Sequence, residues 1–207
     1  MSLRFALLGF LSTEGASGYA IAREFSESMG WFWHASHSQI YPELRRLEEE
    51  GLLWSRPPDG NDGRTKRIYE ITDRGRAELR QWLAEPVEYP PSRDPERTKF
   101  IYLDEMPLDT IRQHLEDHRS HYSWLLGVYR EQLRQVDART HPRLRKRLVA
   151  RKDADPELVA GLKAFALRGN VERARQEIAW ADDVLSWLNR FEEQPRTRPD
   201  EPRVVVS

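Results

Sequence analysis

The sequence predicts a mainly α-helical fold with one small β-hairpin, built as a winged helix-turn-helix domain followed by an all-helical domain. One amphipathic helix pattern ends at Gly51, and two short strand patterns separated by turn residues follow it directly. A proline-dense run over residues 86–95 then divides the chain, and beyond it apolar residues recur every three or four positions. A helix followed at once by a hairpin is the layout of a winged helix.

Composition limits the classes of protein that fit. Hydrophobic residues make up 39% and charged residues 32% of 207 residues, which is typical of a helix-rich globular chain. No run of about 18 apolar residues is present, so we expect no membrane span and no membrane partner. The chain has no cysteine, which excludes disulfides and thiolate zinc sites and is consistent with a cytoplasmic protein.

The first two predicted helices lie close together in the sequence. Residues 3–13 form a short, mostly apolar segment, and Ser17 is a plausible N-cap for the next helix. That second helix is predicted from Gly18 to about Met29, with Ala22 and Phe25 on its apolar side.

The third predicted helix begins at Ser36. Ser36 and Gln39 have the spacing of a capping box, in which each side chain bonds the other residue's backbone N–H. Apolar residues at helical spacing follow, Pro42 lies within the helix, and Gly51 has the position of a C′ glycine that ends it.

Two strands and a fourth helix complete the predicted first domain. Strands are expected at residues 52–56 and 67–72, with the turn residues 57–63 between them. Thr72 or Asp73 is expected to cap a helix that runs to about residue 84.

The hairpin tip carries the cations that suit a DNA-binding wing. Arg64, Lys66 and Arg67 can reach backbone phosphates, and the third predicted helix would read the major groove. The net charge of −1 argues mildly against DNA binding, because affinity for DNA comes largely from neutralised phosphates. Any positive surface must therefore be local.

The second half of the chain is predicted to be wholly helical. Helices are expected at residues 96–104, from about 107 to 137, and from 156 to 193. The last helix carries a heptad-like seam of Ala174, Ile178, Ala181, Leu185 and Leu188. An exposed seam of this kind would need a cover, which favours a homodimer. The predicted divisions are 1–85 for the winged helix-turn-helix domain, 86–95 for a linker, 96–193 for a helical dimerisation domain and 194–207 for a disordered tail.

The start of the third helix supplies the main candidates for reading DNA. They are Ser36, His37, Ser38, Gln39 and Tyr41, whose polar groups suit base edges or phosphates. The alternative is local: Gln39 would be occupied by the cap and Tyr41 by the core.

Two further residues are candidates for phosphate contact. Arg45 lies off the apolar stripe, but it could equally pair with one of the acids at 48–50, one turn later. Tyr19 could offer its hydroxyl to a phosphate at the start of the second helix, or it could pack against the first helix.

Three histidines share one face of the long helix. His114, His118 and His121 could hold a metal by spacing alone, but a packing seam is the stronger interpretation because His118 lies on the apolar stripe. We therefore predict no metal and no cofactor. No phosphate loop, nucleophile elbow or zinc-protease motif occurs, so we predict that the chain is not an enzyme.

Several short motifs resemble one family. They occur in order as Ser17-Gly18-Tyr19-Ala20-Ile21, Phe32-Trp33, Gln39-Ile40-Tyr41-Pro42-Glu43-Leu44, Leu47-Glu48-x-x-Gly51-Leu52 and Tyr69-x-Ile71-Thr72-x-x-Gly75-Arg76. The first 84 residues or so are similar to the PadR family of transcriptional regulators, in the branch with the longer helical C-terminal domain. The resemblance implies a homodimeric repressor that binds a pseudo-palindromic operator in double-stranded DNA and releases it when a small aromatic or hydrophobic effector binds.

A ligand sensor with an aromatic-lined pocket is a further hypothesis, and it is compatible with DNA binding. Phe5, Trp82 and Phe100 are candidates for an aromatic pocket, although aromatic stripes are more often core. The alternative to DNA binding is a winged helix that contacts another protein, which the near-neutral charge and the acids at 48–50 keep open.

Overall fold

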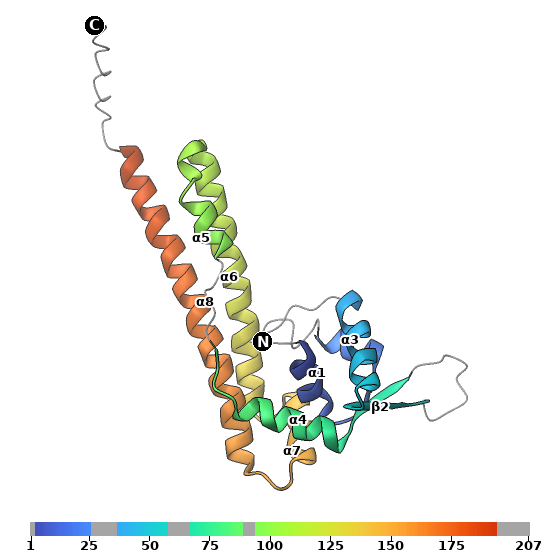
Figure 1. Cartoon of the computed structure of the whole chain (residues 1–207). Coiled ribbons are helices and arrows are strands. Elements are labelled where there is room, and N and C mark those ends of the chain that lie inside the picture. The colour runs from blue at the N-terminus through green and yellow to red at the C-terminus, as the bar shows by residue number, and fades with distance from the viewer. Residues whose placement is uncertain (1–2, 26–36, 58–66, 89–93, 194–207) are drawn as a thin grey trace, which may run out of the picture. The chain divides into compact units, whose positions relative to one another are not determined.

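The computed structural model describes residues 3–25, 37–57, 67–88 and 94–193. These residues fall into two compact units (Figure 1). The first unit comprises residues 1–91 together with 142–155, and the second comprises 92–141 together with 156–207. The predicted mainly α fold with a small hairpin is confirmed.

The first unit is a winged helix. Its elements in chain order are α1 (Leu3–Leu11), β1 (Ala16–Ser17), α2 (Gly18–Glu24), α3 (His37–Glu49), β2 (Leu53–Arg56), β3 (Ile68–Ile71), α4 (Asp73–Ala84) and α7 (Pro142–Ala150). The strands form an antiparallel sheet in the order β1-β3-β2, with Leu53 opposite Ile71 and Ala16 opposite Tyr69. β1 is not predicted from the sequence, because two residues are too few for a strand pattern.

Apolar side chains of α1, α2, α3 and the sheet converge on one core. Leu7, Leu8, Ile40, Leu44 and Leu47 are fully buried there. The predicted inner face of the third helix is thus confirmed, and Pro42 lies within that helix as expected. The predicted end of the second helix and the capping residue Ser36 lie outside the described residues.

The connections on either side of the hairpin are fixed by local chemistry. Gly51 has a φ of 71°, and the N–H groups of Gly51 and Leu52 bond the carbonyls of Glu48 and Leu47, both at 2.9 Å. This pattern is a Schellman motif, so the predicted glycine stop is confirmed. Thr72 caps α4, because its Oγ1 accepts a bond from the N–H of Gly75 at 3.0 Å.

The second unit is built on two long helices. It contains α5 (Pro95–Phe100), the 3₁₀ helix η2 (Leu103–Glu105), α6 (Leu108–Asp137) and α8 (Pro156–Glu193). α6 and α8 lie side by side and run in opposite directions (Figure 1). The predicted long helices are confirmed, whereas the helix expected at 96–104 is split into α5 and η2.

The heptad-like seam of α8 lies inside this unit. Ala174, Ala181, Leu185 and Leu188 are buried, and Leu115 of α6 packs against the two leucines. The seam is therefore covered by the chain's own α6, so it does not support a dimer in the way the sequence suggested.

Residues 142–155 join a different unit from the predicted one. The predicted boundaries place them in the helical domain, whereas α7 belongs to the first unit. Arg143 binds Glu24 at 2.6 Å, its guanidinium lies 3.4 Å from the centre of the Phe10 ring, and Leu144 is fully buried. Such long-range pairs leave no periodic signal in the sequence.

Candidate nucleic-acid interface

A concave surface of the first unit brings the N-terminus of α2, the outer face of α3 and the hairpin together. Its volume is about 680 Å³, and its lining residues are Ser17, Gly18, Tyr19, Tyr41, Arg45, Glu48, Glu49, Arg67 and Tyr69. We call it the α2–α3–wing groove. Four of the predicted DNA-binding residues line it, namely Tyr19, Tyr41, Arg45 and Arg67.

The corner between β1 and α2 forms one wall of the groove. Ser17 caps α2 by accepting a bond from the N–H of Ala20 at 3.2 Å. A Cβ on Gly18 would lie 2.6 Å from Cε1 of Tyr41, so only glycine allows this ring to lie so close. Tyr19 is 55% exposed and Tyr41 is 36% exposed, so both rings reach the surface.

The two neighbouring arginines of α3 have different surroundings. Arg46 binds Glu50 at 3.1 Å, and Glu50 also binds Arg4 at 2.6 Å. Arg45 is exposed and lines the groove, and within the described part of the chain it has no ion pair or hydrogen bond. The alternative of an ion pair one turn later is therefore observed for Arg46 and not, among the described residues, for Arg45.

Acidic residues were missed as part of this surface. Glu48 accepts a hydrogen bond from Ser55 Oγ at 2.5 Å and forms an ion pair with Arg67 at 3.3 Å. The ion pair holds Arg67 at the base of the wing. The side chain of Arg67 remains 65% exposed. Tyr69 is buried behind the groove, and this burial raises its pKa above the usual value. The (i, i+7) pairing of Glu48 with Ser55 depends on the turn at Gly51, which the sequence did show.

The remaining DNA-binding candidates are described only in part. Ser38 and Gln39 are exposed at the start of α3, and His37 is the first residue of that helix. Ser36, Arg64 and Lys66 lie outside the described residues, as does the predicted disordered tail.

The effector candidates are divided between the two units. Phe5 and Trp82 stack on each other in the first unit, with ring centroids 4.7 Å apart. Phe100 belongs to the second unit and packs edge-on against Trp180 at 4.9 Å. Phe100 and Trp180 line a cavity of about 160 Å³ together with Lys99 and His114.

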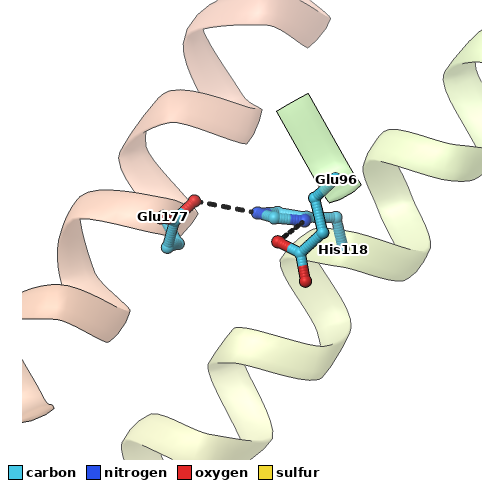
Figure 2. Close-up of side chains that lie close together, drawn as sticks. All are labelled: Glu96, His118 and Glu177. Carbon is cyan, nitrogen blue, oxygen red and sulfur yellow. Dashed lines mark hydrogen bonds and ion pairs between the residues drawn. The ribbon is translucent and has the colours of Figure 1, made fainter. Parts of the chain in front are cut away.

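Glu96, His118 and Glu177 form a cluster of titratable side chains (Figure 2). Glu96 and His118 also line that cavity. His118 places Nε2 3.2 Å from Glu177 and Nδ1 3.6 Å from Glu96. Arg97 donates to the same Glu177 oxygen at 2.6 Å. Burial, followed by the charges of Glu96 and Glu177, raises the pKa of the adjacent Tyr122 to about 12.

The composition of this cluster would suit a metal, but its geometry does not. The ligand atoms of Glu96, His118 and Glu177 lie within 4.8 Å of one another. A metal needs its ligands to converge on one point, whereas here each carboxylate faces a different ring nitrogen (Figure 2). The cluster instead ties α5, α6 and α8 together. His114 and His121 are not part of the cluster.

Known proteins of one family share this fold. The PadR-like family of transcriptional regulators matches residues 7–81, and the C-terminal domain of virulence activator alpha matches residues 92–189. The probable transcriptional regulator Rv1176c of Mycobacterium tuberculosis is 31% identical over 91% of this chain and 98% of its own length. This chain belongs to the PadR-like family. Its relatives are transcriptional regulators, not enzymes.

Two solved structures extend this likeness. Bacillus subtilis PadR, a negative transcriptional regulator, bound to operator DNA is 26% identical with a TM-score of 0.70, covering 90% of this chain and 98% of that chain. The same protein is known in complex with p-coumaric acid. The virulence activator AphA of Vibrio cholerae is 30% identical with a TM-score of 0.63, covering 92% of this chain and 99% of that chain. In the described ranges, no helix is long and apolar enough to cross a membrane.

Proposed function

We propose that this PadR-like regulator is a cytoplasmic homodimeric repressor, whose α2–α3–wing groove binds a pseudo-palindromic operator. The observation that supports it most is the arrangement of Tyr19, Tyr41, Arg45 and Arg67 around one groove. Two hydroxyl groups and two guanidinium groups on a concave surface match the donors that contact DNA phosphates and base edges. Operator DNA bound to B. subtilis PadR is consistent with this use.

Glu48 and Glu49 line the same groove and would repel phosphates. Glu48, however, is engaged by Ser55 and Arg67, so it positions a cation of the wing. With a net charge of −1, the chain must bind DNA through a few local cations. We therefore expect modest affinity that decreases steeply as salt rises.

A second copy of the chain would cover the apolar surface that the second unit leaves exposed. A groove of about 620 Å³ in that unit is lined largely by apolar side chains. Ile101 is 67% exposed, Met106 is 46%, Trp187 is 51% and Phe191 is 38%. Two antiparallel helices can bury only one face of each against the other, so this second face needs a partner. A dimer would also match the symmetry of a pseudo-palindromic operator.

The effector of this repressor would be a small aromatic or hydrophobic compound. The cavity beside Phe100 and Trp180 has about 160 Å³, close to the roughly 150 Å³ of a cavity known to hold benzene. The complex of B. subtilis PadR with p-coumaric acid supports the same class of ligand.

The paired arginines of α3 provide the sharpest test. DNA would be selected from a random pool by the full-length protein, and its affinity measured by fluorescence anisotropy at several salt concentrations. Arg45→Ala should weaken binding by about tenfold or more, because each protomer of the dimer loses a charge-assisted contact to phosphate. It should reduce the salt slope by about 1.8, or about 0.9 per protomer. Arg46→Ala removes the same charge from a residue already paired with Glu50, so its effect should be smaller.

Equal effects of the two substitutions would contradict the proposal that Arg45 contacts DNA from the α2–α3–wing groove. Failure of the wild-type protein to select any DNA would contradict the function itself and favour a winged helix that binds protein. Adding p-coumaric acid or a related phenolic compound should release the selected DNA if the effector is of this class. Retention of DNA with every compound of such a panel would contradict the proposed effector class.

A further inference from the structure

α7 is the most basic segment of the chain, and the winged-helix pattern does not account for it. Between residues 142 and 152 there is no acidic residue, and six cations occur: Arg143, Arg145, Lys146, Arg147, Arg151 and Lys152. The whole chain has a net charge of −1, so this concentration stands out. A local surplus of this kind is typical of a surface that meets a polyanion.

One side of α7 is fixed to the winged helix. Arg143 binds Glu24 at 2.6 Å, and its guanidinium lies 3.4 Å from the centre of the Phe10 ring. Burial lowers the pKa of Arg143. The Nη1 atom of Arg143 lies 3.8 Å from Glu14, which is too far for a hydrogen bond. Arg147 lies 3.4 Å from Ser12 Oγ. These contacts give α7 a defined orientation on this unit.

The other side of α7 faces solvent. Arg145 is exposed and Val149, one turn later, is 69% exposed, while Lys152 is exposed in the turn that follows the helix. Arg145 and Lys152 make no ion pair or hydrogen bond with any residue that the structure describes. Their charges are therefore available to a partner.

This exposed side belongs to the same unit as the α2–α3–wing groove. Lys146 pairs with Glu14, and Glu14 lies three residues before Ser17, which lines the groove. Three residues span at most about 11 Å, so α7 lies close to the β1–α2 corner of the groove. One turn of DNA is about 34 Å long, so a duplex in the groove extends well beyond this corner.

We propose that α7 and the turn after it form a second DNA-contacting surface, in which Arg145 and Lys152 bind backbone phosphates that flank the sequence read by α3. The contact would be independent of sequence, because it involves phosphates and no base edges. It would supply affinity that a chain of nearly neutral net charge otherwise lacks. The inference depends on the proposed function, since it requires that the groove bind DNA.

The test is a salt series with the full-length double variant Arg145→Ala/Lys152→Ala. Its affinity for a 40-base-pair duplex containing the selected sequence would be measured by fluorescence anisotropy. We expect the salt slope to decrease by about 3.6, since each phosphate contact contributes about 0.9 and the dimer presents Arg145 and Lys152 twice. On a duplex trimmed to the selected sequence alone, the variant and the wild type should bind alike.

The matched control is Arg130→Ala/Arg190→Ala. Both arginines are exposed in the second unit and have no described partner, so the change in net charge is the same. This control should retain the wild-type slope. Circular dichroism would check that each variant is folded, which we expect because the substituted side chains of α7 face solvent.

An unchanged slope for the α7 variant, with Arg45→Ala still weakening binding, would overturn the inference and leave the proposed function intact. That result would direct attention to an acidic protein segment as the partner of α7. An equal loss of slope in the α7 variant and the control would also overturn it, because the effect would then come from net charge. No DNA binding by the wild type would overturn both proposals.

Discussion

The two units bury their apolar residues in different ways. In the winged-helix unit three helices and a sheet converge, and the core closes on itself around residues such as Leu8, Ile40 and Leu44. In the helical unit two antiparallel helices share a single seam, and large side chains such as Phe165 and Trp187 remain 67% and 51% exposed. A closed core is complete in one chain, whereas a two-helix layer leaves a second face that a partner must cover.

The largest expected effect is a loss of stability, and it should distinguish the buried seam between α6 and α8 from the exposed apolar face of the same unit. Leu115→Ala should cost about 2–5 kcal/mol of unfolding free energy, since Leu115 is 1% exposed against Leu185 and Leu188. Trp187→Ala should cost less stability per protomer and mainly weaken self-association. Urea unfolding would measure the first effect, and sedimentation velocity would measure the second.

If Trp187→Ala left the sedimentation coefficient unchanged at all concentrations, the apolar groove would not be the dimer interface. Leu162→Ala is the control for simple loss of exposed apolar surface, because Leu162 is 64% exposed on α8 and does not line that groove.

The next effect compares a glycine in each unit. A Cβ on Gly75 would lie 2.2 Å from the backbone oxygen of Leu52, so Gly75→Ala should destabilise the winged helix by about 3 kcal/mol. A Cβ on Gly169 meets nothing within 4 Å, so Gly169→Ala in α8 should stabilise by about 0.5–1 kcal/mol. Thermal unfolding followed by circular dichroism measures both, and the same sign for the two variants would contradict this difference between the units.

An effect confined to alkaline pH lies in the helical unit. Tyr122 has a pKa of about 12 in the folded chain against an ordinary value of 10.0. Between these values the unfolded chain loses the phenol proton first, so the unfolding free energy falls as pH rises from 10 to 12 and is unaffected below 10. Because Tyr122 is only partly buried, the loss should be about 1 kcal/mol.

Melting temperatures measured from pH 9 to 11.5 would show this loss. Tyr122→Phe should flatten the decline, since phenylalanine has no proton to lose. An identical decline in both proteins would mean that the environment of Tyr122 does not favour its neutral form. Tyr69 also has a raised pKa, but it lies in the other unit. Tyr69→Phe should therefore leave the part of the decline that Tyr122 causes unchanged.

The sequence alone determined the family and most elements of the winged helix, but not β1 or α7. The glycine stop at Gly51, the cap at Thr72 and the apolar face of α3 are local features, set by backbone preference and periodicity within a few residues. The seam of α8 was also visible in its spacing. Periodicity identifies an apolar face, however, without identifying what covers it, and here α6 covers the seam.

Only the tertiary structure decided the remaining points, because each depends on residues far apart in the chain. It separated the paired Arg46 from the groove-lining Arg45, and it placed Glu48 between Ser55 and Arg67. It also placed α7 with the winged helix, through pairs that join residues more than 100 positions apart. Such pairings follow from how the chain folds back on itself, and no local pattern encodes them.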